Sequence, residues 1–450
     1  MHLPDMTRSG KTPNAPFRWR KSFLLFSIGC FGLLLLTTHL GYFDQGKGTK
    51  SNFFDEEFDT SHTPRGRIAG CSWYEQYLRL HNDNIEKLRR GDSDVKLLVY
   101  ECHPSTVACG GLGDRLSGMA SLFYVSVVLG RAFVVDQSMP LPLNVTLVPN
   151  SDINWDVSAL ILPTYSSASV KLIDKFDLTA VNKIFGADLS SKNVLRVSMN
   201  RFFTGMSLWS KLKCENRWFF GSMHRKNEAC ELKLNLQTPS DYFALAFDLL
   251  FKPTVEVRLR MNELSQSLLS SKTETVSKNY VGVHARLGGT VQRTTESAGW
   301  QDPERDSLSD TKQFIQCAHD RAFTLLPSTP GEPMPFFVFS DSEEFKKRIS
   351  LEDSLVRYAN DTYLFHIDRS RASLTTTVRG TIDATADLLL LSQARCIVAS
   401  YSTFSGAASS LLRFREGKSC FFHAKSCDKG NIDFWEQTEK GFDLSECENV

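Results

Sequence analysis

Short apolar runs alternate with helical patterns of apolar residues, and this alternation constrains the fold more than any other feature of the chain. The run at 95–100 predicts a strand, apolar residues recur at helical spacing over 116–127, and the run at 132–135 predicts a second strand. Two strands joined by a helix form a βαβ unit with parallel strands. The first readable part of the chain is therefore predicted to be α/β.

A second alternating series follows a middle section, from about 150 to 275, that is harder to interpret. Its predicted strands lie at 280–283, 336–339, 363–365 and 396–399, and its predicted helices lie at 381–392 and 405–412. Two such series predict two Rossmann-like domains that face each other across a cleft. Ligands bind at the carboxyl ends of the strands in sheets of this kind, so polar residues at those ends are the candidate site residues.

The N-terminal part of the chain predicts a membrane anchor. No charged residue occurs from Ser22 to Phe43, and a membrane-spanning helix needs about 20 apolar residues. Basic residues concentrate before this run, which by the positive-inside rule predicts type II topology. A cleaved signal peptide is the alternative, although its apolar core is usually shorter, at about 7–15 residues. The predicted order is cytosolic tail, anchor, stem, N-terminal α/β domain and C-terminal Rossmann-like domain, at 1–21, 22–43, 44–67, 68–275 and 276–450.

The cysteines agree with a luminal domain. Of the 11 cysteines, Cys30 lies within the predicted anchor, and the even number that remains is typical of disulfides in an oxidising compartment. The chain lacks a C-x-x-C motif that would favour zinc. Asn144 and Asn360 begin glycosylation sequons that a luminal domain could use. The short-range candidate disulfides are Cys102 with Cys109, Cys214 with Cys230, and Cys420 with Cys427.

The charge balance excludes one class of function. Lys and Arg number 52 against 51 Asp and Glu, so the net charge is +1, and a nucleic-acid-binding protein would carry a basic excess. The length of 450 residues is sufficient for two or three domains. The composition is therefore that of a folded protein of enzyme size.

Two predicted strand ends carry glycines or basic residues. Gly110 to Arg115 lie between the first strand and its helix, where glycines allow close approach of a ligand and helix N–H groups favour anions. A tight turn with a polar cap is the alternative. His284 and Arg286 follow the strand at 280–283, and their alternate spacing places both side chains on one face. Arginine can bind a diphosphate in bidentate geometry, whereas a solvated strand end is the alternative.

Two further strand ends carry acids and hydroxyls. Asp341, within Ser340-Asp341-Ser342-Glu343, could accept hydrogen bonds from a nucleobase or ribose, bind a metal, or form part of a helix cap. Ser400 to Ser405 place several hydroxyls at a predicted helix N-terminus, which suits phosphate oxygens.

These segments together resemble a known family. G-G-L-G-D-R-L, V-G-V-H-A-R, F-S-D-S and the segment that ends S-Y-S-T-F-S are similar to the fucosyltransferase superfamily of α1,2-, α1,6- and protein O-fucosyltransferases. The resemblance covers roughly 95–140 and 280–425. It implies a GT-B-like fold of two facing domains, GDP-fucose as donor substrate, inversion at the anomeric carbon, no metal or other cofactor, and a type II anchor in the Golgi membrane.

The resemblance also implies roles for individual residues. Arg286 would hold the diphosphate and stabilise the leaving GDP, His284 would contact the nucleotide, and Asp341 would lie near the ribose or guanine. The remaining donor-binding candidates are the hydroxyl residues Ser402, Thr403 and Ser405, expected at phosphate oxygens, and the turn glycines Gly111 and Gly113.

The chain departs from the family after the arginine. Relatives usually carry an acidic residue shortly after it, whereas this chain has Leu287, Gly288, Gly289 and Thr290. Inversion is helped by a base that takes the proton of the acceptor hydroxyl. Glu296 is the candidate base, and a solvated loop glutamate is the alternative.

Two other functions stay open. The first is an inverting transferase that uses another nucleotide sugar with a metal held by Asp341 and Glu343, since Asp92-Ser93-Asp94 is interpreted as a solvated turn. The second is a non-catalytic, glycan-binding scaffold of the same fold. The expected partners are a nucleotide sugar, a glycan or glycoprotein acceptor and the membrane; a homodimer is left open.

Overall fold

The computed structural model describes twelve stretches of the chain, namely residues 72–103, 109–150, 152–158, 160, 167–172, 192–200, 239–268, 280–288, 306–325, 334–360, 374–416 and 420–427. The chain divides into the units 1–52 and 53–450, and every described residue belongs to the second. The predicted anchor and stem, the strand at 363–365 and Glu296 lie outside the described residues. Among the helices within the described stretches, none is both long and apolar enough to cross a membrane.

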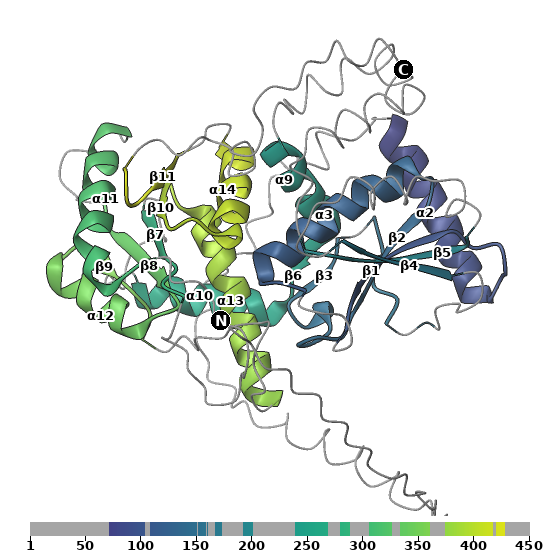
Figure 1. Ribbon diagram of the computed structural model, residues 1–450, viewed down its shortest axis with the longest axis horizontal. Helices are drawn as coiled ribbons and strands as arrows, with labels where there is room; N and C mark the ends of the chain where they lie inside the picture. Colours follow the sequence, from purple (N-terminus) through teal and green to yellow (C-terminus); the bar gives the residue numbers. More distant parts are fainter. Residues whose placement is uncertain are drawn as a thin grey trace, which may run out of the picture. The chain divides into compact units, whose positions relative to one another are not determined.

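The first sheet confirms the predicted βαβ unit. Its strands lie in the order β2-β1-β5-β4, and all neighbouring pairs are parallel. Helix α3 connects β1 to β2 and packs against the sheet (Figure 1). The bounds are α2 Ser72–Arg90, β1 Leu97–Cys102, α3 Leu112–Val128, β2 Ala132–Gln137, β4 Ser167–Leu172 and β5 Val194–Met199.

The two faces of this sheet pack against different partners because side chains alternate along each strand. Tyr100 of β1 and Phe133 of β2 belong to the main core together with Phe123 of α3. Val99 and its neighbours on the opposite face pack against the C-terminal half of α2 through Ile85. This second face becomes polar toward the carboxyl ends of its strands.

The second sheet confirms the predicted C-terminal α/β series. Its strands lie in the order β11-β10-β7-β8-β9, again with parallel neighbours (Figure 1). The strands are β7 Val281–Ala285, β8 Phe336–Ser340, β9 Val356–Arg357, β10 Cys396–Ala399 and β11 Phe421–His423. The helices are η2 Leu308–Asp310, α11 Thr311–Leu325, α12 Glu343–Glu352, α13 Leu374–Gln393 and α14 Thr403–Glu416. The predicted α/β class with parallel sheets is therefore confirmed.

The remaining described elements are two α-helices, a short 3₁₀-helix and a small antiparallel pair of strands. These elements are η1 Leu143–Val145, β3 Leu147–Pro149, α9 Pro239–Leu250, β6 Phe251–Pro253 and α10 Val255–Leu268, with β3 pairing β6. Helix α9 packs on α14, and α10 packs on α13. Two ion pairs join these helices: Arg413 Nε lies 3.1 Å from Asp241 Oδ1 in a partly buried pair, and Arg260 Nε lies 2.6 Å from Asp383 Oδ1 in a buried one. The domain boundary at 275–276 stays a prediction.

Three disulfides occur within the described stretches, and one was predicted. Cys102 is bonded to Cys109, as expected. The predicted bond between Cys420 and Cys427 is wrong. Cys420 is instead bonded to Cys396, because Cys396 begins β10 and Cys420 directly precedes the neighbouring parallel strand β11. Cys427, which follows β11, is bonded to Cys317 of α11. The candidate pair Cys214 and Cys230 lies outside the described residues.

Candidate functional site

Three neighbouring strands of the second sheet end at the same place. The order β10-β7-β8 aligns His284 with both Ala399 and Phe339, so the residues that follow the three strands lie side by side. These residues include Arg286 after β7, Asp341 after β8 and Ser400 after β10. The fold thus brings together three of the four polar segments that the sequence singled out.

Asp341 holds both Arg286 and the backbone that carries it. Its Oδ2 lies 3.0 Å from Arg286 Nη1 and accepts a hydrogen bond from Gly288 N at 3.1 Å. Its Oδ1 accepts from Leu287 N at 2.8 Å. The neighbouring Ser342 begins α12, where its Oγ accepts from the backbone N of Phe345. Ser342 therefore takes the cap role that the sequence left open, and Asp341 positions the arginine, a role that the sequence did not reveal; a contact of Asp341 with the ribose or guanine stays a prediction.

His284 and Ser400 complete the support of Arg286. Arg286 N donates to Ser400 Oγ at 2.6 Å, and Ser400 N donates to the carbonyl of His284 at 2.9 Å. The His284 side chain is buried and stacks on Phe404, with ring centroids 5.0 Å apart. The sequence did not identify Ser400 as a positioning residue, because its role depends on the pairing of β7 with β10.

The hydroxyls at the start of α14 have different roles. Ser402 Oγ accepts from Ser405 N at 3.1 Å, which is the contact of an N-cap, and Ser405 Oγ donates to the carbonyl of Ser400 at 2.8 Å. Both side chains are buried, whereas Thr403 is partly exposed. The buried serines thus build the helix start. Because the first N–H groups of a helix have no partner within it, the backbone of Thr403 and Phe404 is the part suited to an anion.

The first turn of α3 meets the first turn of α14. A Cβ on Gly113 would lie 2.5 Å from the carbonyl carbon of Thr403 and 2.6 Å from the backbone N of Phe404, so only glycine permits this approach. Gly111 precedes α3, and its N donates to Asp114 Oδ2 at 2.9 Å. Two helix N-termini, one from each sheet, therefore converge close to Arg286, and their dipoles favour negative charge.

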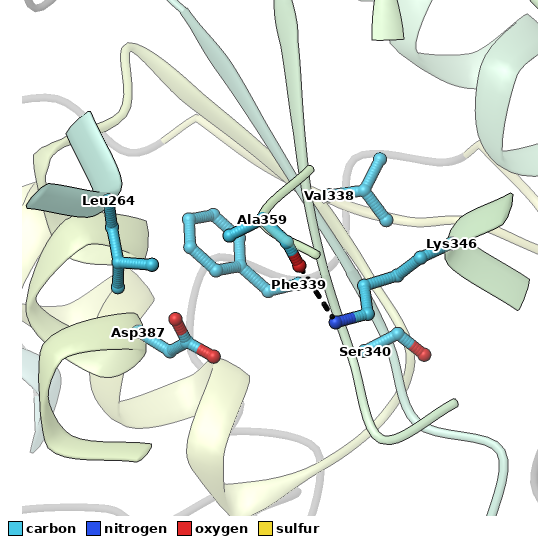
Figure 2. A pocket seen from close by; sticks show the side chains of 7 residues that line it. All are labelled: Leu264, Val338, Phe339, Ser340, Lys346, Ala359 and Asp387. Atoms are coloured by element: carbon cyan, nitrogen blue, oxygen red, sulfur yellow. Dashed lines mark hydrogen bonds between the residues drawn. The ribbon is translucent and has the colours of Figure 1, made fainter. Parts of the chain in front are cut away.

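A hollow beside β8 contains a residue that the sequence did not reveal. Figure 2 shows Asp387 of α13 on one side of it and Lys346 of α12 on the other. The Lys346 ammonium donates to the carbonyl of Ala359 at 3.3 Å and pairs with Glu343. The hollow has room for about one water molecule. The residues that line it are Leu264, Val338, Phe339, Ser340, Lys346, Ala359 and Asp387.

The surroundings of Asp387 disfavour the charged form of its carboxyl group. Burial raises its pKa to about 7; the nearby Lys346 acts in the opposite direction, and Asp383 one turn earlier raises the pKa further. Asp383 itself has Arg260 as a counter-ion. Asp387 could not be recognised from its sequence context, because it lies directly before the apolar run Leu388–Leu391 and looks like part of a core helix.

The two sequon asparagines lie in different surroundings. Asn144 is half-buried, its Nδ2 donates to Asp156 Oδ2 at 2.9 Å, and the sequon residue Thr146 is buried. Burial acts to raise the pKa of Asp156, but hydrogen bonds from the backbone N of Ser158 and from Asn144 outweigh it and hold this pKa below its usual range. Asn360 is exposed, so it is the sequon asparagine that an oligosaccharyltransferase could reach in the folded protein.

The residues considered for a metal are engaged with cations or N–H groups. Asp92 and Asp94 lie in the exposed turn after α2 and pair with Arg90 and Lys87, at 2.6 and 3.0 Å, which fits their interpretation as a solvated turn. Asp341 is bound to Arg286. In the described part of the chain, the group with metal-ligand spacing is Glu101, His103 and Asp136, which the sequence did not single out.

No protein-family model and no curated protein sequence matches the chain. Its fold is similar to solved fucosyltransferases at low identity. A mutant of FUT1 from Arabidopsis thaliana in complex with GDP is 17% identical, with a TM-score of 0.46 over 76% of this chain and 77% of that one. NodZ α-1,6-fucosyltransferase soaked with GDP-fucose is 15% identical (TM-score 0.41; 70% and 93% covered), and POFUT1 in complex with GDP is 11% identical (TM-score 0.37; 73% and 99% covered).

Proposed function

We propose that the chain is an inverting fucosyltransferase that transfers fucose from GDP-fucose to a glycan or glycoprotein acceptor. The observation that carries the proposal is the convergence of Arg286 with the N-termini of α3 and α14 at the carboxyl ends of two parallel sheets. The two sheets are the facing domains of a GT-B-like transferase in this proposal. The sequence motifs at these positions are those that resemble the fucosyltransferase superfamily.

The diphosphate of the donor fits this convergence. Arginine stays charged throughout the reaction and offers five N–H donors, so Arg286 can bind phosphate oxygens while one of its nitrogens remains paired with Asp341. The N–H groups of Thr403 and Phe404 supply further donors at the helix start. Negative charge grows on the diphosphate as the bond to the sugar breaks, and donors already in place stabilise that charge.

In this proposal, the hollow beside Asp387 binds the guanine base of the donor. A carboxylate can accept hydrogen bonds from both N1–H and the 2-amino group of guanine, a donor pair that adenine and uracil lack. The hollow adjoins Ser340, which directly precedes Asp341. A purine is larger than the space present, so the lining side chains must move apart when the nucleotide binds. Binding of guanine would explain why the chain has a carboxylate in surroundings that raise its pKa to about 7.

A luminal location follows from the same proposal. Three disulfides within the described residues support an oxidising compartment. Together with the uncharged segment 22–43, they support a single-pass type II protein of the Golgi membrane whose catalytic part is luminal.

Calorimetry on the full-length chain in mild detergent tests the donor assignment. We expect GDP and GDP-fucose to bind in the presence of a chelator, and UDP and ADP to bind at least tenfold more weakly. Asp387→Asn should remove the preference for GDP over ADP, whereas Asp92→Asn, in the exposed turn, should not. Binding of UDP alone, or binding that requires a divalent cation, would assign a different transferase. A folded sample that binds no nucleotide would favour the scaffold.

A further inference from the structure

A group of polar side chains lies on one face of the first sheet, where β1 and β2 end. The register pairs Glu101 with Asp136, so these two carboxylates are neighbours on the same face. His103 and Ser138 directly follow the last paired residues of β1 and β2, and their side chains are in hydrogen-bond contact. All four side chains are at least partly exposed to solvent.

The contacts of His103 fix which ring nitrogen can accept a proton. Its Nε2 lies 3.2 Å from Asp136 Oδ2 and 4.0 Å from Glu101 Oε1. A nitrogen that faces two carboxylates carries the proton, so the neutral ring is protonated at Nε2. Its Nδ1 lies 2.7 Å from the hydroxyl oxygen of Ser138 and is then the accepting nitrogen. A carboxylate, an imidazole and a hydroxyl in this order are the arrangement of a general base and its orienting acid.

A divalent cation is the other occupant that these residues could have. The ligand atoms of Glu101, His103 and Asp136 lie within 4.8 Å of one another. However, Arg196 of β5 already supplies positive charge: its Nη1 lies 3.0 Å from Asp136 Oδ2 and 3.5 Å from Glu101 Oε1. A cation would have to compete with this guanidinium, whereas proton transfer to His103 would not. The charges therefore favour a base over a metal site.

Covalent and hydrogen-bonded contacts tie this group to the first turn of α3. His103 follows Cys102, whose disulfide to Cys109 brings the chain back to the residue before Gly110. Arg115 links the loops after both strands, because its Nε donates to the carbonyl of Gly110 at 2.8 Å and its Nη1 donates to the carbonyl of Met139, the residue after Ser138. The same turn of α3 contacts the start of α14 at Gly113.

We propose that His103 is the general base for the acceptor hydroxyl and that Asp136 is its positioning residue. The proposal rests on the proposed transferase function. The acceptor hydroxyl replaces the Ser138 hydroxyl as the hydrogen-bond partner of His103 Nδ1, and its proton passes to that nitrogen. The oxygen forms a bond to the anomeric carbon of fucose, the bond from that carbon to the β-phosphate oxygen breaks, and GDP leaves with the electron pair. The imidazolium then returns its proton to solvent.

The test uses the full-length enzyme and GDP-fucose with water as acceptor, and follows the release of GDP. We expect His103→Ala to lower kcat by about 10²-fold or more, the usual contribution of a general base, without weakening GDP binding. Free imidazole should restore part of the rate. Asp136→Asn should lower kcat and leave the KM for GDP-fucose unchanged.

The matched control is His319→Ala, which removes another histidine paired with an aspartate, Asp353, far from the strand ends that carry the site. Its turnover should equal that of the wild type. The proposal is overturned if His103→Ala turns over at the wild-type rate, or if free imidazole restores none of the lost rate. A wild-type rate that a chelator abolishes and Mn²⁺ restores also overturns it, in favour of a metal. If the wild type binds GDP-fucose without releasing GDP, the transferase function itself fails.

Discussion

Arg286 and Asp341 extend from the carboxyl ends of the neighbouring strands β7 and β8, with Nη1 and Oδ2 3.0 Å apart. The same carboxylate accepts hydrogen bonds from the N–H groups of Leu287 and Gly288. One aspartate thus fixes the guanidinium and the loop beneath it. An arginine that is already ordered loses little conformational freedom when it binds a diphosphate, which favours affinity.

The first prediction concerns this support. Asp341→Ala should lower the free energy of unfolding by about 1–3 kcal/mol, because a guanidinium and two N–H groups lose their acceptor. Denaturant unfolding measures the change. Saturating GDP should enlarge the difference from the wild type, since an arginine that is no longer ordered binds the diphosphate more weakly and the variant gains less stability from the ligand. Glu344→Ala, at an exposed position on the adjoining helix, is the control and should change stability by less than about 0.5 kcal/mol. A variant as stable as the wild type would contradict the assigned role.

The second prediction concerns the contact between α3 and α14. Gly113→Ala places a methyl group 2.5–2.6 Å from the backbone of Thr403 and Phe404, which has to move. We expect a loss of about 1–3 kcal/mol in stability and weaker GDP binding, because the two helix N-termini are pushed apart. Gly111→Ala is the matched control: its Cβ would meet Asp114 Oδ2 at 3.6 Å, an ordinary contact. If both variants bind GDP equally well, the convergence of the helices is not part of the donor site.

The sequence predicted the strands that carry the site because each is a short apolar run bounded by glycines or polar residues. It also identified Arg286 and Ser402 correctly as residues at strand or helix ends. It could not show that Ser402 and Ser405 are buried in the helix cap, since that depends on contacts made by Ser400. The role of Asp341 beside Arg286 likewise depends on β8 lying next to β7.

Three residues of interest were missed for different reasons. Asp387 lies beside a run of leucines and therefore looks like a tolerated polar residue on a core helix. His103 and Asp136 are far apart in sequence and meet only through the parallel register of β1 and β2. Local spacing was misleading for Cys420 and Cys427, because short separation favoured a bond that the strand order does not allow.

The third prediction concerns disulfides. Non-reducing peptide mapping should show the bonds Cys317–Cys427 and Cys396–Cys420. The bond Cys317–Cys427 spans 110 residues and Cys102–Cys109 spans 7, so removing the first should destabilise more if the loss follows loop entropy, which is about 4.7 kcal/mol for a loop of about 100 residues. Paired Cys→Ser variants compared by thermal unfolding measure this. A peptide that joins Cys420 to Cys427 would contradict the strand pairing.

The fourth prediction separates stability from binding at Asp387. Because the folded protein raises the pKa of this carboxyl from 3.8 to about 7, the folded state binds more protons than the unfolded state between these values. Its contribution to stability therefore falls as the pH rises through this window. Asp387→Asn removes the titration, so we expect the variant to be more stable than the wild type above pH ~7 and to lose this advantage near pH ~4. Thermal unfolding across this pH range provides the measurement.

The same substitution should weaken GDP binding, because an amide cannot accept from both N1–H and the 2-amino group of guanine. Asp383→Asn is the matched contrast, four residues earlier on α13 and paired with Arg260. Removing its charge weakens the ion pair at Arg260 Nε and leaves the exposed Glu263 as a counter-ion of this buried guanidinium, so it should destabilise the protein at neutral pH, where Asp387→Asn stabilises it. If the Asp387→Asn variant is more stable than the wild type and still binds GDP with wild-type affinity, guanine does not bind at Asp387. If loss of this carboxylate raises stability and weakens GDP binding, its role is to bind the ligand and not to stabilise the protein.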